Sequence, residues 1–113
     1  MTPGDLYWVE MLSRGGHEQA GRRPAVILQT ASASAVLSTV LIIPLTSQQA
    51  ALRFPGTVYI EADGQNGLAR ASVALVFQLT AIDAQNLRTR LGSLSADVLA
   101  DIYSALEEIS REV

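Results

Sequence analysis

The apolar residues of this chain recur with two different spacings, and the change between them limits the fold more than any other feature. Up to about residue 80 they gather in short runs rich in Val and Ile, separated by Gly, Pro, Ser and Asn, a pattern typical of β-strands. From residue 95 onward they recur every three or four residues, at Val98, Ile102, Leu106, Ile109 and Val113. That spacing predicts one apolar face of a helix. We therefore expect a mainly β domain followed by one packing helix.

The individual elements follow from these patterns. Strands are predicted at Leu6–Met11, Pro24–Gln29, Val36–Leu45, Gly56–Ala62 and Ser72–Leu79. Between them, Ser13–Arg22 and Gln48–Pro55 are predicted as exposed loops, a connecting loop separates the second and third runs, and Asp63–Gly67 is predicted as a turn. A short helical turn is expected at Asp83–Leu87, and Ser95 is the expected N-cap of the final helix. Pro44 predicts that the end of its strand leaves the sheet ladder. The expected fold is a small, strongly bent sheet or barrel of the α+β class.

Composition limits the kind of protein further. The 113 residues fit one domain, spanning residues 1–113, since domains cluster at roughly 100–150 residues. There is no cysteine, and His17 is the only histidine, so we expect no thiolate or multi-histidine metal site within one chain and no bound cofactor. The longest apolar stretch, Thr39–Leu45, is too short to span a bilayer, and Met1–Asp5 does not resemble a signal peptide. We expect a cytoplasmic protein without a membrane partner.

Charge is distributed unevenly along the chain. The net charge is −3, which disfavours broad, non-specific binding to duplex DNA. Residues 1–56 nevertheless carry four arginines against three acids, whereas residues 57–113 carry four arginines against eight acids. All basic residues are arginine, the side chain that pairs with phosphate through two donors. A local cationic site near the N-terminus is therefore compatible with this composition.

Two segments carry candidate functional residues. In GHEQAGRRPAVIL, residues 16–28, a polar loop delivers Arg23 to the start of an apolar strand, and Pro24 constrains Arg23 toward extended backbone. Arg23 could serve a site or merely form a surface salt bridge, and His17 could be merely solvated. In the second segment, the hydroxyls of Thr46 and Ser47 directly follow an apolar strand. Such hydroxyls often cap a turn, although strand ends also carry functional groups.

These segments and three others resemble the MazF/PemK toxin family. The resemblance runs in order from residue 4 to about residue 110. The matching pieces are GDLYWV (4–9), GHEQAGRRPAVIL (16–28), IPLTSQ (43–48), FQLTAID (77–83) and LGSLS (91–95). The segment with GHEQ, Gly and ArgPro is the most specific of them. The resemblance implies an SH3-like barrel with helices, a homodimer, and a sequence-specific, ribosome-independent endoribonuclease. It also implies a labile cognate antitoxin whose disordered acidic segment blocks the RNA groove.

Carried over residue by residue, the resemblance places the family's catalytic Arg at Arg23 and its catalytic Thr at Thr46. Glu18 and Gln19, with His17, match the loop that touches RNA in relatives, and Ser47 and Gln48 are further RNA-binding candidates. Some relatives add a catalytic Arg and Asp at the positions of Leu75 and Phe77 here, so this chain lacks that pair.

The chemistry that these residues suggest is metal-free cleavage of single-stranded RNA by attack of a 2′-hydroxyl on the adjacent phosphorus. Arg23 can stabilise charge on the phosphate oxygens and Thr46 can donate a hydrogen bond. Because the pKa of Arg exceeds about 12, Arg23 suits general acid catalysis poorly. His17 is the candidate accessory acid or base, since the ordinary pKa of His is about 6.5.

Other side chains and other functions stay open at this stage. Gln19, Gln48 and Gln49 could bind base edges or be ordinary loop residues, and Trp8 is expected in the core rather than against a base. The alternative functions are a gyrase-poisoning toxin of the same fold without nuclease activity, and a catalytically dead module that sequesters an antitoxin.

Overall fold

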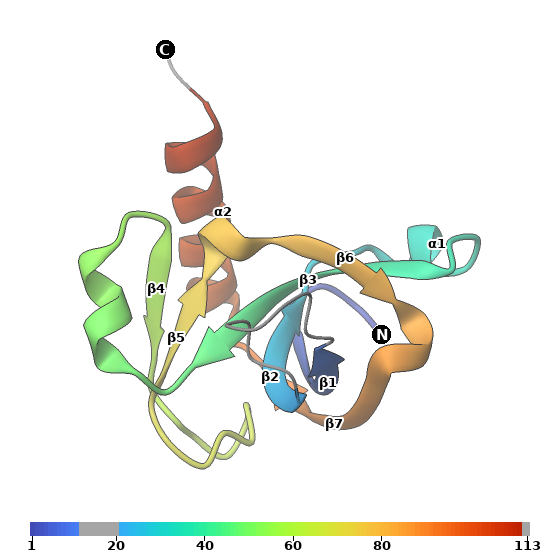
Figure 1. The fold of residues 1–113 in the computed structure, drawn as a ribbon, viewed down its shortest axis with the longest axis horizontal. Helices are drawn as coiled ribbons and strands as arrows, with labels where there is room; N and C mark the ends of the chain where they lie inside the picture. The colour runs from blue at the N-terminus through green and yellow to red at the C-terminus, as the bar shows by residue number, and fades with distance from the viewer. Residues whose placement is uncertain (12–20, 112–113) are drawn as a thin grey trace.

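The structure, a computed structural model, describes residues 1–11 and 21–111. It is mainly β with a C-terminal helix, as predicted (Figure 1). In chain order the elements are β1 (Asp5–Met11), β2 (Gly21–Ile27), α1 (Ala31–Ser34), β3 (Thr39–Thr46), η1 (Gln49–Arg53), β4 (Thr57–Ile60), β5 (Ser72–Leu75), η2 (Val76–Gln78), β6 (Thr80–Asp83), η3 (Ala84–Asn86), β7 (Leu87–Ser93) and α2 (Ala96–Ser110).

Strand β3 is the centre of the sheet. The strands follow the order β4-β5-β3-β2-β1-β7, and β6 also pairs with β3. One edge of β3 pairs with β2, while the other pairs with β6 over Thr39–Ile42 and with β5 at Leu45 and Thr46. All these pairings are antiparallel. Because β5 and β6 share one edge of β3, the sheet bends around this strand (Figure 1).

The single strand predicted at Ser72–Leu79 is wrong, because the chain breaks there into β5, η2 and β6. Along β3, Leu45 and Ile42 are three residues apart, whereas their partners Ala74 and Thr80 are six apart. The three extra residues form η2, which turns out of the ladder and lets the chain rejoin β3 further along. An insertion of this kind bends a sheet.

The prediction that Pro44 ends the ladder is also wrong, since Pro44 pairs in register with Ala25. Leu28 N donates to Leu41 O at 3.0 Å, and hydrogen-bonded pairs alternate with non-hydrogen-bonded pairs in an antiparallel ladder. Leu41 thus directs its carbonyl oxygen toward β2. Pro44 lies three residues further along β3, so its nitrogen points away from β2. It faces the gap between the last residue paired to β6 and the first paired to β5, where a missing N–H breaks no ladder bond.

Two apolar clusters lie on opposite faces of the central strands. The first lies beneath α2 and the second between β1, β2 and β3, with residues of β6 and β7 packed against it. Alternation along each strand explains the division: in β2, Val26 belongs to the first cluster and Ala25 and Ile27 to the second. The first contains Leu6, Val26, Ile43, Leu45, Ile60, Ala74, Val76, Leu94, Ile102 and Ala105. The second contains Val9, Ala25, Ile27, Val40 and Ile42.

Helix α2 begins as predicted, with Ser95 Oγ accepting a hydrogen bond from Val98 N at 3.3 Å. It packs against β4 and η2, with Ile102 fully buried and Ile109 39% exposed. The last residue of the predicted stripe, Val113, lies outside the described residues. No helix in the described part of the chain is long and apolar enough to cross a membrane.

Other local predictions have mixed outcomes. The turn at residues 63–67 is confirmed, and Asp83 caps a short 3-10 helix by accepting from Gln85 N at 2.9 Å. The loop after β3 contains the 3-10 helix η1, which was not predicted. Helix α1 and strand β7 were not predicted either. The last two residues of the exposed loop predicted at Ser13–Arg22 belong to β2, which already begins at Gly21; residues 13–20 of that prediction lie outside the described residues.

The connection from β4 to β5 is tied by its own side chains. Asn66 is buried; its Oδ1 accepts from Asp63 N and Leu68 N at 3.1 and 3.0 Å, and its Nδ2 donates to Glu61 O at 2.8 Å. Gly67 has a φ of +71°, and a Cβ there would overlap the backbone oxygen of Leu91. The connection therefore has one defined position against β7.

We predict that Gly67→Ala lowers the free energy of unfolding by about 1–3 kcal/mol, because of backbone strain and the overlap with Leu91. Gly64→Ala is the matched control, since a Cβ at Gly64 meets nothing within 4 Å and Gly64 has no positive φ. Urea unfolding of both variants measures the difference. Equal midpoints would show that the close contact between Gly67 and the Leu91 backbone does not constrain the connection.

Candidate active site

One cleft, with a volume of about 460 Å³, opens where the start of β2, the end of β3 and the β4–β5 connection meet. Trp8 of β1 and Leu91 of β7 complete its walls. Its lining residues are Trp8, Arg22, Arg23, Pro24, Leu45, Thr46, Ser47, Gln48, Gly67, Leu68, Ala69, Arg70, Ser72 and Leu91. Segments far apart in sequence therefore form a single site.

The cleft brings together four of the residues selected from the sequence. Arg23, Thr46, Ser47 and Gln48 all line it. The remaining candidates, His17, Glu18 and Gln19, lie outside the described residues.

Antiparallel pairing accounts for the meeting of Arg23 and Thr46. Ala25 pairs with Pro44, and continuing this register by two residues in each strand brings Arg23 alongside Thr46. Arg23 is also held from the other side, because it pairs with Val9 of β1. The backbone of the half-buried Arg23 is thus fixed in a sheet, which limits the reorganisation needed to present a guanidinium.

Thr46 is the last residue of β3, and its hydroxyl caps the turn that follows. Its Oγ1 accepts a hydrogen bond from Gln48 N at 3.2 Å, as the local sequence suggested. A hydroxyl that accepts one hydrogen bond keeps its own proton to donate. The turn can therefore orient the Thr46 oxygen while its O–H stays available to a ligand in the cleft.

The cleft is cationic although the chain is acidic overall. Arg22 and Arg23 line it from β2, and Arg70 lines it from the β4–β5 connection, while no carboxylate is among its described lining residues. Clefts lined by one sign of charge focus the electrostatic field and favour ligands of opposite charge. Sequence reasoning selected Arg23 rather than its neighbour Arg22. It did not select Arg70, because only the fold brings Arg70 to this wall.

The structure also places two further side chains that the sequence analysis considered, Trp8 and Gln49. Trp8 is not part of either apolar cluster; it is half-buried, pairs with Pro24 and lines the cleft, so the expected core role is wrong. Gln49 Nε2 donates to Ala71 O at 3.3 Å, which links η1 to the β4–β5 connection. Within the described residues, no three His, Cys, Asp or Glu side chains form a group that could hold a metal ion.

Comparison with known proteins places this fold in one class. MazF of Deinococcus radiodurans superposes with a TM-score of 0.79 at 30% identity, covering 96% of this chain and 94% of that one. Endoribonuclease EndoA of Bacillus subtilis is 29% identical over 104 residues, which are 92% of this chain and 89% of EndoA. Endoribonuclease MazF2 of Mycobacterium bovis is 27% identical over 110 residues, 96% of each chain.

The fold is therefore that of the MazF toxins. Residues 2–110 match the family described as PemK-like, MazF-like toxin of type II toxin–antitoxin system. The chain belongs to this family.

Proposed function

We propose that this chain is a single-domain, sequence-specific, ribosome-independent endoribonuclease toxin that cleaves single-stranded RNA without a metal ion. The observation that carries the proposal is the meeting of Arg23 and Thr46 in one arginine-lined cleft. The names of the relatives from B. subtilis and M. bovis, both called endoribonucleases, support RNA as the substrate and cleavage as the activity. They favour a nuclease over a gyrase-binding toxin without chemistry and over an inert antitoxin-binding module.

Single-stranded RNA suits this cleft better than a duplex. Unpaired bases can stack on aromatic side chains and present their edges to polar groups. Trp8 offers an aromatic surface on the cleft wall, and Ser47 and Gln48 offer hydrogen-bonding groups beside Thr46. A local cationic cleft can hold a single strand without the broad basic face that duplex binding needs.

The reaction divides into charge stabilisation and proton transfer. The 2′-oxygen forms a bond to phosphorus and the bond from phosphorus to the 5′-oxygen breaks, which leaves a 2′,3′-cyclic phosphate and a 5′-hydroxyl. Arg23 stabilises the negative charge on the non-bridging oxygens, and the Thr46 O–H donates a further hydrogen bond. The 2′-hydroxyl loses a proton and the leaving oxygen gains one, and His17 is the candidate group for this accessory role.

The same cleft suits control by an antitoxin in the cytoplasm. A structure of MazE–MazF from D. radiodurans has a TM-score of 0.75 with this chain at 28% identity, so a structural relative is complexed with its antitoxin. We propose a homodimer with the RNA groove along its interface and a cognate antitoxin whose disordered acidic segment covers the arginines.

The first test is cleavage of a long single-stranded RNA in EDTA. Wild-type protein should cut at discrete positions and leave 2′,3′-cyclic phosphate ends. Arg23→Ala should lose about 10²–10³ in rate, because it removes a charge-stabilising donor. Arg23→Lys should recover little, since a point charge cannot replace the planar fork. An absolute need for Mg²⁺, or intact RNA together with inhibited gyrase, would contradict the proposal.

The second test separates the hydroxyl of Thr46 from its shape. Thr46→Val keeps the volume and removes the O–H, so cleavage should fall by about 10²-fold or more. Thr46→Ser keeps the hydroxyl and should retain most activity. The lost hydrogen bond from Gln48 N should also cost Thr46→Val about 0.5–1.5 kcal/mol of stability, which thermal unfolding measures. Full activity of Thr46→Val would remove Thr46 from the mechanism.

The third test concerns inhibition. An acidic antitoxin segment and RNA should compete for Arg23, so a saturating concentration of either should weaken the binding of the other. Calorimetry should show favourable enthalpy offset by the entropy of ordering the segment. Simultaneous binding with unchanged affinities would exclude direct occlusion of the cleft.

A further inference from the structure

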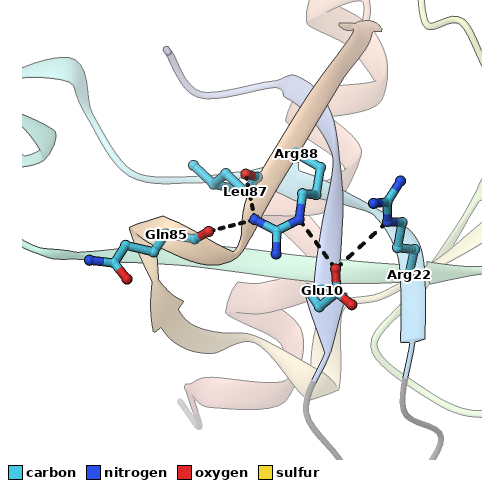
Figure 2. Close-up of polar contacts among 5 residues, drawn as sticks. All are labelled: Glu10, Arg22, Gln85, Leu87 and Arg88. Carbon is cyan, nitrogen blue, oxygen red and sulfur yellow. Dashed lines mark hydrogen bonds and ion pairs between the residues drawn. The ribbon is translucent and has the colours of Figure 1, made fainter.

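Glu10 contacts two arginines through the same carboxylate oxygen (Figure 2). Its Oε2 lies 3.6 Å from Arg22 Nε and 3.2 Å from Arg88 Nε. Glu10 and Arg22 are register partners on β1 and β2, and Arg88 comes from β7. Arg22 is the only member of this trio that lines the cleft. The trio therefore links Arg22 in the cleft to Glu10 of β1 and Arg88 of β7, which lie outside it.

The two arginines are held unequally. Arg88 Nε donates to Glu10 at 3.2 Å, and Arg88 Nη1 donates to Gln85 O at 2.7 Å. Arg22 reaches Glu10 only at 3.6 Å, beyond hydrogen-bond range, and 62% of its side chain is exposed. Glu10 is thus hydrogen-bonded to Arg88, while Arg22 is retained by charge alone and can leave at low cost.

We propose that Arg22 binds a backbone phosphate of the RNA in competition with Glu10, whose carboxylate holds Arg22 beside the cleft until phosphate replaces it, and that Arg88 is a positioning residue that keeps Glu10 partnered when Arg22 leaves. This inference rests on the proposed function. A phosphate can accept two hydrogen bonds from one guanidinium, which the 3.6 Å contact does not provide. When Arg22 swings away, Glu10 keeps Arg88 as its partner, so no carboxylate is left without a counter-charge.

The proposal predicts opposite effects for two variants that both disrupt the trio. Glu10→Gln removes the competitor of the phosphate, so RNA binding should tighten. Arg88→Gln leaves Glu10 with Arg22 alone, so RNA binding should weaken. A purely structural ion-pair network predicts instead only the small effects of the changed net charge, independent of Arg22, because exposed ion pairs contribute little.

The experiment measures the binding of a fluorescent single-stranded RNA over a series of salt concentrations. This RNA carries 2′-fluoro groups in place of the 2′-hydroxyls and therefore lacks the attacking group. Each phosphate contact on a single strand contributes about 0.7 to the slope of log affinity against log salt. Arg22→Gln should lower this slope by about 0.7 and weaken binding about fivefold at about 0.1 M salt. Arg111→Gln is the charge-matched control outside the cleft, where Arg111 pairs with Glu107 at 3.4 Å, and it should leave the slope unchanged.

A double-mutant cycle separates the competition between Glu10 and phosphate for Arg22 from the effect of net charge. The gain from Glu10→Gln should vanish in the Arg22→Gln background and persist in the Arg70→Gln background, because Arg70 lines the same cleft and has no ion pair to Glu10. With natural RNA, Arg22→Gln should raise KM and leave kcat unchanged, as expected for a contact made equally in the ground and transition states.

The outcomes distinguish this inference from the proposed function. An unchanged salt slope in Arg22→Gln, or a Glu10→Gln gain that survives without Arg22, would overturn the inference. Wild-type protein that binds the probe with the expected slope but leaves natural RNA intact would overturn only the proposed nuclease activity. A wild-type chain that fails to bind the probe would overturn both.

Discussion

The pairing of β3 along both of its edges is the constraint on which the rest of the molecule depends. Its residues Val40, Ile42, Ile43 and Leu45 are almost fully buried, and burying one such side chain contributes roughly 1.5–3 kcal/mol. Alternate residues of the strand enter different apolar clusters, so a shift of one residue would exchange the two faces. The register is therefore fixed, and with it the point at which Thr46 leaves the sheet.

This register also explains why the cleft draws on distant parts of the chain. An antiparallel partner of β3 must begin where β3 ends, so the first residues of β2, including Arg23, lie beside Thr46. On the opposite edge, β5 pairs with the same end of β3 and positions the connection that carries Arg70. Arg23 and Arg70, each more than 20 residues from Thr46 in the sequence, thus meet Thr46 at one strand end. Strand ends are the usual place for site groups on a rigid scaffold.

Sequence patterns predict the buried, locally determined parts of this fold and miss the parts that depend on pairing. The runs that became β1, β2, β3 and β4 are apolar enough to identify, as is α2. Strand β7, in contrast, contains Arg88, Thr89 and Arg90, and forms because β1 offers it an edge. The break at η2 is invisible in an apolar run such as Val76-Phe77, since it arises from a register difference between two partners of β3. The family resemblance and the local sequence suggested Arg23 and Thr46, while the cleft positions of Arg22, Arg70 and Trp8 emerge only from the folded chain.

The distribution of charge reconciles an acidic protein with the polyanionic substrate of the proposed function. Net charge of −3 opposes non-specific adsorption to nucleic acid, whereas three arginines that line one cleft favour a polyanion at that cleft. Such a small set of cations supplies few phosphate contacts, so under the proposed function most of the discrimination must come from contacts with the bases. The same small set makes inhibition simple. Under the proposed function, an acidic antitoxin segment that pairs with these arginines would remove the charge stabilisation and the RNA-binding surface together, without a conformational change in the toxin.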